Sequence, residues 1–444
     1  MSRVEVVAVV ATLGVGKRPQ LRETLAALRS QTRRCRVITC DAGPNEYAAR
    51  NEACVEVLDA RRDPERVVFA FVDDDTVPPP HYVERMVSHF ERDERIKVAD
   101  CGLEGDFWGW GRWMTIDTPF WGVGTTLFVR GDAFLAVGGF EVDWDISPPP
   151  RGWRSDTDLL YRIIDRFGYE SYVHDFGVRN VHPRNMGSVW QPEVEARFYR
   201  RHRSKVLRYI APYDPRLCQF VTVKRLEEDP RVVRYLTHDQ KPRLDWIRHE
   251  IHMLDYELRG QTKILDVGGE DGFLFAGTGW DYTVMDIDLY EVPDGKFRRW
   301  DADLPWPFPS NSFDVVVLGE VLEHVERPDH VWREACRVAR RLVLATIPNE
   351  YEWSEDKAPL LTREERMRRD GFTDVDEMAR HFASKSPFLR ELTSEKEKPH
   401  LWHVRWFRRE DVRRLVGDAE IGEIKFDGWA WFTVRWIKPK NSVV

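Results

Sequence analysis

Apolar runs alternate with amphipathic stretches through the first half of the chain. Val4–Leu13 is a nearly continuous apolar run that predicts a buried strand, and residues 19–31 repeat leucine at helical spacing. A short strand over Arg36–Cys40, a helix over residues 47–58 and a strand over Val67–Val72 follow. This alternation predicts an α/β domain with a parallel sheet, whose ligands bind beyond the carboxyl ends of the strands.

The strand pattern stops over residues 193–260 and then returns. Charged helical stretches separated by prolines fill that interval, so we expect a helical linker there. Strand-like runs resume at residues 263–269, 282–288, 313–320 and 341–349. The fold class is therefore predicted as α/β with two doubly wound parallel-sheet domains, residues 1–192 and 261–444, joined by the linker.

Composition restricts the class of protein. The chain has 444 residues, of which 42% are hydrophobic and 32% charged, which is typical of a soluble protein of roughly two or three domains. The formal net charge of −8 argues against a nucleic-acid partner. Six scattered cysteines without a CxxC pair predict a reduced, cytoplasmic protein. No apolar run approaches the about 18 residues that a membrane span needs, so no transmembrane segment is expected.

The stretch VVFAFVDDDTVPPP, residues 67–80, ends a buried strand in three aspartates. Neighbouring carboxylates repel each other unless a cation or hydrogen-bond donors compensate the charge. In an extended segment Asp73 and Asp75 would point to one side and Asp74 to the other. Carboxylate ligands suit Mg²⁺ or Mn²⁺, so a metal site is one interpretation. An ordinary turn or helix cap is the other.

Residues 4 to about 192 resemble the family 2 glycosyltransferases. The pieces that match, in order along the chain, are Arg18 with TLAALRSQT, Asp41, the ARN segment at 49–51, the triplet at 73–75, FVRGDAFLAVGGFE at 128–141 and WRSDTDLLYRI at 153–163. The resemblance implies a GT-A fold and an inverting enzyme that uses a nucleotide-sugar donor and a divalent metal. The interval between Asp41 and Arg50 is shorter than usual in the family, which indicates a trimmed sheet.

The resemblance also implies roles for single residues. Asp41 would contact the nucleotide base, Arg50 the diphosphate, Asp73 the ribose and Asp75 the metal ion, with Thr12 also in the donor site. A carboxylate can accept a base N–H, and a guanidinium can bind phosphate oxygens bidentately. Asp41 as a turn carboxylate and Arg50 as a surface cation of a helix remain open alternatives.

The same resemblance suggests the general base that an inverting transfer requires. Asp156 in SDTDLL stands at the matching position, although Ser155 replaces a common glutamate, and Asp158 is expected to start the helix. Asp156 as a helix cap is the alternative. His182 would complete the metal shell or serve a structural purpose. The tryptophan-rich segment 107–122 suits either sugar stacking or core packing.

Residues 262 to about 436 resemble the class I S-adenosylmethionine-dependent methyltransferases. The matching pieces are ILDVGGEDG (264–272), VMDID (284–288), DADLPWPFPSNSFD (301–314), GEVLEHVERP (319–328) and HLWHVRWFRREDVRRLV (400–416). The cofactor-binding residues that the resemblance implies are Asp266, Gly268, Gly272, Asp286, Asp301 and Glu320. Missing side chains in a glycine loop let the backbone approach a cofactor.

Three further features of this half bear on activity. Glu270 replaces a usual glycine, and its side chain either points out of the loop or crowds the methionine moiety of the cofactor. His324 and His403 are candidate bases for a hydroxyl acceptor. The charged insert at 351–399 is expected to form a helical lid over the acceptor.

Together these patterns suggest a bifunctional enzyme that transfers a sugar to a glycan-type acceptor and a methyl group to the same glycan. One alternative is a glycosyltransferase whose second half only binds S-adenosylmethionine or a partner. Another is a methyltransferase half that acts on protein, lipid or nucleic acid. The sequence pattern does not identify the nucleotide or the sugar of the donor, or the atom that is methylated.

Overall fold

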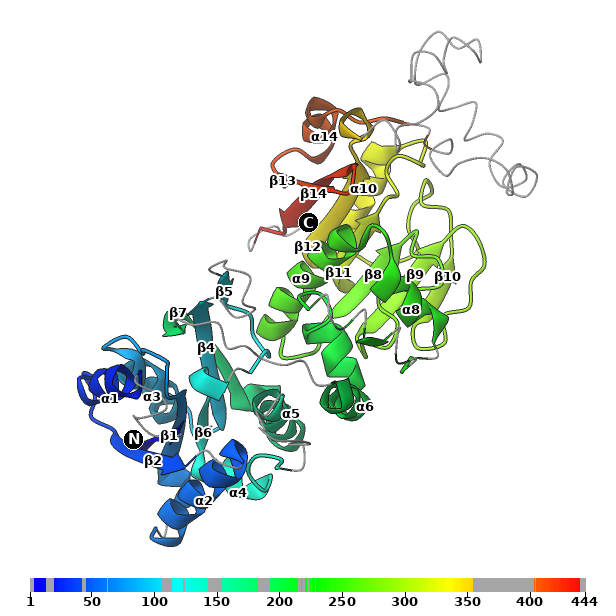
Figure 1. Cartoon of the computed structure of the whole chain (residues 1–444). Helices are drawn as coiled ribbons and strands as arrows, with labels where there is room; N and C mark the ends of the chain where they lie inside the picture. The colour runs from blue at the N-terminus through cyan, green and yellow to red at the C-terminus, as the bar shows by residue number, and fades with distance from the viewer. Residues whose placement is uncertain are drawn as a thin grey trace, which may run out of the picture. The chain divides into compact units, whose positions relative to one another are not determined.

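The computed structural model of the chain divides into two compact units, Met1–Ile210 and Ala211–Val444 (Figure 1). The structure describes residues 4–12, 20–41, 45–61, 63–105, 114–122, 124–142, 154–182, 192–214, 217, 220–221, 224, 226–227, 229–353, 403 and 405–439. Most of the predicted lid, the tryptophan-rich residues 107–113 and Arg18 lie outside them.

The first unit is a mixed seven-stranded sheet with helices. Its sheet runs β2-β1-β3-β6-β4-β5, with β7 paired to β4. The strands are β1 (Glu5–Thr12), β2 (Arg36–Asp41), β3 (Val67–Asp73), β4 (Val98–Gly105), β5 (Met114–Ile116), β6 (Phe128–Arg130) and β7 (Tyr172–His182). The helices are α1 (Leu21–Arg29), α2 (Glu46–Asp59), α3 (Tyr82–Arg92), α4 (Gly131–Ala136), α5 (Ser155–Phe167) and α6 (Pro192–Tyr209).

Strands β1, β2 and β3 are parallel, as the alternating pattern predicts. Strand β6 then runs antiparallel to both β3 and β4, so the parallel order breaks in the middle of the sheet. The second sheet runs β10-β9-β8-β11-β12-β14-β13 and is parallel from β10 to β12, with an antiparallel pair at its end. The α/β class is confirmed for both units.

The second unit contains the remaining elements. Its strands are β8 (Lys263–Val267), β9 (Asp281–Asp286), β10 (Lys296–Arg299), β11 (Phe313–Gly319), β12 (Ala339–Pro348), β13 (Glu420–Phe426) and β14 (Trp429–Ile437). Its helices are α8 (Pro230–Thr237), α9 (Lys241–Glu257), α10 (Pro328–Val338) and α14 (Arg409–Val416). The residues predicted as a linker are divided between the units: α6 belongs to the first, and α8 and α9 belong to the second.

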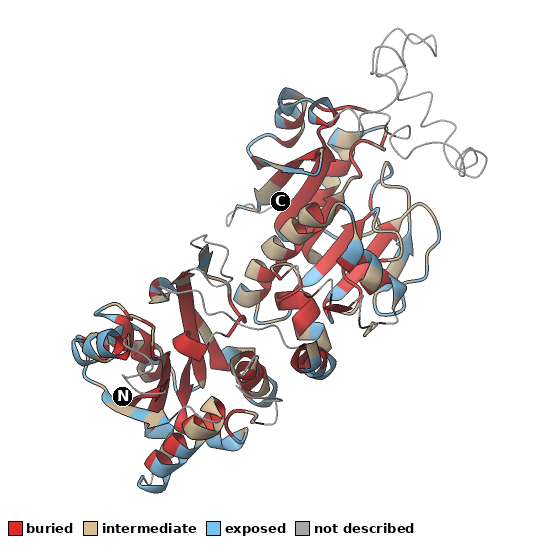
Figure 2. Ribbon diagram, viewed as in Figure 1, coloured by how far each residue is buried: buried red, intermediate tan, exposed pale blue. Residues whose placement is uncertain are grey.

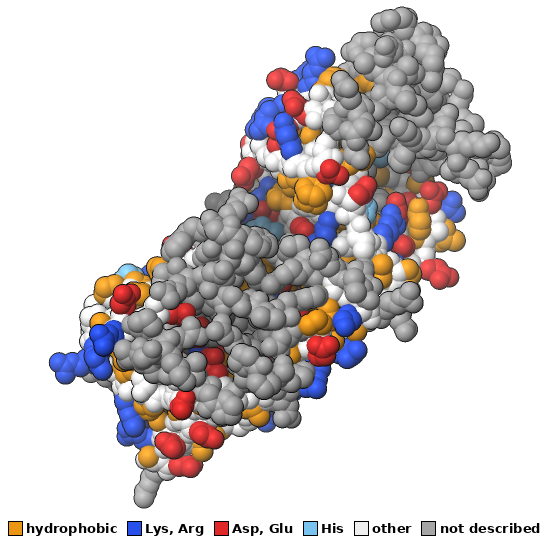
Figure 3. All heavy atoms as spheres, viewed as in Figure 1, with side chains coloured by type: hydrophobic (Ala, Val, Ile, Leu, Met, Phe, Trp, Pro, Cys, Tyr) orange, Lys and Arg blue, Asp and Glu red, His pale blue; other side chains and the backbone are white. Residues whose placement is uncertain are grey.

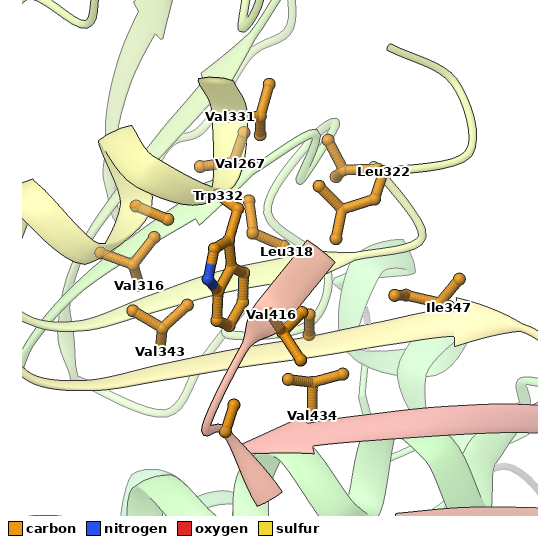
Figure 4. Close-up of a cluster of buried hydrophobic side chains, with 14 of the residues drawn as sticks. Val267, Val316, Leu318, Leu322, Val331, Trp332, Val343, Ile347, Val416 and Val434 are labelled. Carbon is orange, nitrogen blue, oxygen red and sulfur yellow. The ribbon is translucent and has the colours of Figure 1, made fainter. Parts of the chain in front are cut away.

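Burial follows the strand pattern in each sheet, since the central strands are red in Figure 2 and the outer faces of the helices are blue or tan. In the second unit, α10 packs its apolar face on β11 and β12. Figure 4 shows the Trp332 ring of α10 among Val316, Leu318, Val343 and Val416. The Trp332 indole fills a large volume of the core. If the ring were removed, the neighbouring side chains could not close the cavity.

Trp332→Ala should therefore destabilise the second unit by about 3–5 kcal/mol, the usual cost of deleting a buried large aromatic ring. Hydrogen exchange followed by mass spectrometry should show faster exchange in β11 and β12, with β1 and β3 unchanged. Trp300→Ala is the matched control, because Trp300 is only partly buried against the same cluster. Equal effects of the two substitutions would contradict the assigned role of Trp332.

The surface of the described residues is mixed in charge. On the face shown in Figure 3, basic and acidic side chains lie close together over the described atoms of both units. None of the helices within the described ranges has an apolar stretch long enough to cross a membrane.

Candidate active sites

The carboxyl edge of β2-β1-β3 gathers the predicted donor residues of the first unit. Thr12 pairs in register with Asp41, and Ala11 pairs with Asp73, so the three strands end level with one another. The side chain of Thr12 is buried, whereas Asp41 is exposed at the end of the edge strand. Parallel strands place their ligand site at this edge. The backbone therefore brings Thr12, Asp41 and Asp73 to one place.

The aspartate triplet follows directly. Asp73 ends β3, Asp74 is buried in the turn, and Asp75 is half-buried. The Asp73 amide donates to Thr125 Oγ1 at 3.2 Å, and the Thr125 hydroxyl donates to Thr76 Oγ1 at 2.6 Å. These bonds fix the turn by backbone and hydroxyl contacts. The carboxylates of Asp73 and Asp75 are both partly open to solvent, which suits a metal and a polar ligand.

Arg50 is buried among carboxylates. It lies on α2, is 1% exposed, and its Nη2 is 2.6 Å from Asp73 Oδ1 and 2.7 Å from Glu46 Oε1. Its Nη1 is 3.8 Å from Asp156 Oδ1. A single guanidinium thus holds acids from β3, α2 and α5 together. The predicted contact of Arg50 with a diphosphate stays a prediction, and in this structure the guanidinium positions Asp73 and Asp156.

Asp156 lies in the first turn of α5, which begins at Ser155 and not at Asp158 as expected. Tyr47 donates its hydroxyl to Asp156 Oδ2 at 3.0 Å, and Asp156 Oδ1 has no hydrogen-bond partner within the described part of the chain. A side chain at Gly124 would collide with the carboxylate at 2.5 Å. Asp156 is no helix cap, because its carboxylate faces Tyr47, Arg50 and the Gly124 backbone.

Burial raises the pKa of Asp156 to about 6, an effect that Arg50 opposes and Asp73 reinforces. A carboxylate with a raised pKa is a stronger base than an ordinary aspartate, and it is still ionised at neutral pH. Asp158, in contrast, is fully buried and bonded to Arg162 and His202, which is a structural arrangement.

His182 is the last residue of β7 and pairs with Gly105 in register. Its side chain lies outside the described residues, so its predicted metal role stays a prediction.

Sequence reasoning did not identify Glu46 and Tyr47 as members of this site. Burial raises the pKa of Glu46, an effect that Arg50 opposes and Asp73 reinforces. Glu46 and Arg50 are four residues apart on one helix, a spacing that places opposite charges on the same face. That spacing was the available signal for Glu46. No comparable signal marked Tyr47, whose partner Asp156 is distant in the sequence.

In the second unit, the loop after β8 needs glycines because the protein's own side chains pack closely against its backbone. Gly268 and Gly272 have φ of +68° and +75°. A Cβ at Gly268 would meet Val321 at 2.8 Å, and one at Gly272 would meet the Tyr282 ring at 2.8 Å. Asp266 is 3% exposed with Oδ2 lacking a hydrogen-bond partner among the described residues. Burial raises the pKa of Asp266 to about 8.

Glu270, the departure in this loop, points away from the glycines. Its carboxylate forms an ion pair with Arg234 of α8 at 2.5 Å, and its side chain is 41% exposed. Its backbone amide donates to Asp286 Oδ2 at 3.2 Å. Glu270 therefore ties α8 to the loop, and this contact favours the orientation in which its side chain points out of the loop.

The remaining predicted cofactor residues lie at the ends of neighbouring strands. Asp286 ends β9, and burial raises its pKa. The amide of Trp300 donates to the Asp286 carbonyl, which places Asp301 next to that strand end. Glu320 follows β11 and accepts a hydrogen bond from Trp431 Nε1 at 2.7 Å, while Arg243 lies 3.2 Å from its other oxygen. Glu320 is thus engaged by protein groups.

Two family models match the chain in separate regions. The glycosyl transferase family 2 model matches residues 16–140, and the methyltransferase domain model matches residues 265–343. The predicted combination of the two families is confirmed, and the pair of matches supports an enzyme with both activities. No curated protein matches the chain.

Solved structures similar to the chain include several methyltransferases. One from Methanosarcina mazei is 15% identical over 42% of this chain and 96% of its own, with a TM-score of 0.26. The magnesium protoporphyrin IX methyltransferase from Synechocystis, solved with bound S-adenosylhomocysteine, is 15% identical over 44% and 80%, with a TM-score of 0.26. One from Aquifex aeolicus is 13% identical over 51% and 98%, again with a TM-score of 0.26.

Proposed function

We propose that the protein is a bifunctional transferase. The first unit moves a sugar from a nucleotide-sugar donor, with inversion and with a divalent metal, Mn²⁺ or Mg²⁺, to a glycan-type acceptor. The second unit moves a methyl group from S-adenosylmethionine to a hydroxyl of the same glycan. The observation that carries the proposal is the convergence of Asp73, Arg50 and Asp156 at the carboxyl edge of a sheet that matches glycosyltransferase family 2.

In the first unit, each residue has a distinct task. Asp41 and Thr12 line the end of the strands where the nucleotide lies, and Asp73 faces the ribose. The carboxylate chemistry of Asp73 and Asp75 fits a hard divalent cation, which would neutralise the diphosphate. His182 would add a nitrogen ligand. Asp156 takes the acceptor proton, because its pKa of about 6 makes it both ionised and basic near neutral pH.

In the second unit, S-adenosylmethionine would bind beside the loop after β8, where Gly268 and Gly272 adopt positive φ and Asp266 and Asp286 lie at the ends of the adjacent strands. The cofactor supplies an electrophilic methyl group. Asp286 would bind the ribose hydroxyls, Asp301 the adenine side, and Asp266 and Glu320 would line the cleft. Positioning of donor and acceptor provides most of the acceleration in such a displacement.

The alternative of a second unit without catalysis rested on Glu270. The ion pair of Glu270 with Arg234 weakens it, since the side chain is directed toward α8. We place the protein in the cytoplasm because Cys35, Cys40, Cys54, Cys101 and Cys336 are unbridged.

Asp286→Ala should weaken S-adenosylmethionine binding by about 1.5–3 kcal/mol, the loss expected for a charge-assisted hydrogen bond. Isothermal calorimetry of the full chain measures this. Glycosyl transfer should be unchanged, because Asp286 belongs to the other unit. Asp281→Ala is the matched control, being an exposed aspartate at the opposite end of the same strand. Loss of sugar transfer in a folded Asp286 variant would show that the two activities are coupled.

A screen of nucleotide-sugars for metal-dependent hydrolysis, with S-adenosylmethionine calorimetry beside it, tests the proposed function directly. No binding of S-adenosylmethionine at all would overturn the methyl-transfer half, and no hydrolysis of any nucleotide-sugar with Mn²⁺ or Mg²⁺ would overturn the sugar-transfer half.

A further inference from the structure

Three polar side chains from distant parts of the chain converge in the second unit. Glu323 and His324 lie in the loop after β11, and His403 comes from the segment before α14. One ligating atom from each side chain lies within 4.8 Å of the other two. The Arg405 amide donates to the Glu323 carbonyl at 3.2 Å, which joins the two segments.

Glu323 is the unusual member of this cluster. It is 1% exposed, and neither carboxylate oxygen has a hydrogen-bond partner among the residues that the structure describes. A buried carboxylate without donors is costly in the ionised form, and the protonated form would need an acceptor for its O–H. The described residues satisfy neither state, so the arrangement favours a ligand at Glu323.

Nearby acids already have their own partners. Glu320 is held by Trp431 Nε1 at 2.7 Å and by Arg243 at 3.2 Å. Glu350 lies 2.7 Å from His403 Nδ1. Arg243 is thus engaged by Glu320, and among the described residues no arginine or lysine forms an ion pair with Glu323. A bound metal ion would stabilise the ionised form of the Glu323 carboxylate.

His403 is oriented as metal ligands commonly are. A carboxylate on one ring nitrogen fixes the tautomer and the ring orientation, and it directs the lone pair of the other nitrogen toward a metal. With Nδ1 bonded to Glu350, Nε2 is the nitrogen that would ligate. His324 is 34% exposed on its side chain, so the cluster is open on one side. Catalytic metal sites keep such an open position.

We propose that Glu323, His324 and His403 form a binding site for a divalent transition-metal ion. Two nitrogens and one carboxylate suit Zn²⁺, Mn²⁺, Fe²⁺ or Co²⁺. Tetrahedral ligands of one such ion lie about 3.4 Å apart. The three ligating atoms lie within 4.8 Å of one another, so they would have to move together by roughly 1 Å when the ion binds.

The site lies beside the predicted cofactor loop, because Val321, two residues before Glu323, is the side chain that a Cβ at Gly268 would meet. A metal here would bind the acceptor oxygen and lower the pKa of its hydroxyl. The oxygen would then attack the methyl carbon as the carbon–sulfur bond breaks, giving a methyl ether and S-adenosylhomocysteine, with the hydroxyl proton released to water. This role rests on the proposed methyl transfer, whereas the metal site itself does not.

The test uses the full chain with Asp75→Asn, which removes the metal ligand predicted in the first unit. After treatment with a chelator, Co²⁺ is added as the probe, and d–d absorption and stoichiometry by dialysis are measured. We expect one equivalent bound with the visible spectrum of a nitrogen- and oxygen-ligated ion. Glu323→Gln in the same background should weaken Co²⁺ binding by more than about tenfold, because changing a residue that only supports a metal ligand already costs about 10–100-fold in affinity.

Glu326→Gln is the matched control, being a half-buried glutamate three residues along the same loop and outside the cluster, and it should bind as the parent does. His324→Gln is the second variant, for the case that Glu323→Gln does not fold. His324 is partly exposed, so its replacement should be tolerated, and the loss of a nitrogen ligand should change the d–d absorption of bound Co²⁺. Calorimetry with S-adenosylmethionine separates the two proposals: the Glu323 variant should bind the cofactor normally. No Co²⁺ bound by the parent, or unchanged binding and spectrum in folded Glu323 and His324 variants, would overturn the site.

Discussion

Asp156→Asn should reduce the rate of glycosyl transfer by about 10²-fold or more while leaving donor binding nearly unchanged. The amide keeps the shape of the side chain and can still accept from Tyr47, but it cannot take a proton from the acceptor. Turnover with a saturating acceptor and the dissociation constant of the donor are measured separately. If the variant lost donor affinity and kept turnover, Asp156 would belong to the donor site.

Asp165→Asn is the matched control for this variant. Asp165 lies on the same helix, its side chain is 55% exposed, and its ion-pair partner is Lys205 of α6. The same change of a carboxylate to an amide should leave turnover unaltered. A loss in both variants would point to disturbance of α5 as a whole.

The pH dependence gives a second readout of the base. A raised carboxyl pKa means that the protonated, inactive form persists to higher pH than for an ordinary aspartate. Wild-type turnover should therefore decrease as pH falls through about 6, the pKa to which burial raises Asp156. Residual turnover in Asp156→Asn should lose that dependence. An unchanged acid limb in the variant would assign the titration to another group, of which Glu46 is the nearest candidate.

The strand pattern correctly predicted which residues lie at the carboxyl edge of the first sheet. The apolar runs predict strands that end at Asp41 and Asp73. Parallel pairing then brings these strand ends level, independently of how the helices pack. The same argument located Gly268 directly after β8 and Asp286 at the end of β9. Such positions are fixed by local periodicity, which a single sequence contains.

Side-chain partners were not predictable in the same way. The diphosphate contact of Arg50 stays a prediction, but its burial against Glu46 and Asp73 was not foreseen, because the fold brings three acids around one helix position. Glu270 could have pointed either way, and Arg234 of a helix assigned to the linker decides it. These contacts depend on how elements pack, which periodicity does not specify.

Asp75→Ala should abolish nucleotide release from the sugar donor, since the diphosphate leaving group then loses a ligand of the ion that neutralises its charge. Release of the nucleotide is measured against Mn²⁺ and Mg²⁺ concentration. A chelator alone is ambiguous here, because it would also remove an ion from Glu323, His324 and His403. The substitution isolates the first unit, and S-adenosylmethionine binding should be retained. Asp59→Ala, at an exposed position ending α2, should behave as wild type. Full nucleotide release by the Asp75 variant in the presence of a chelator would show that the aspartate triplet holds no catalytic metal, and that its charge is balanced by Arg50 and the hydroxyl-lined turn.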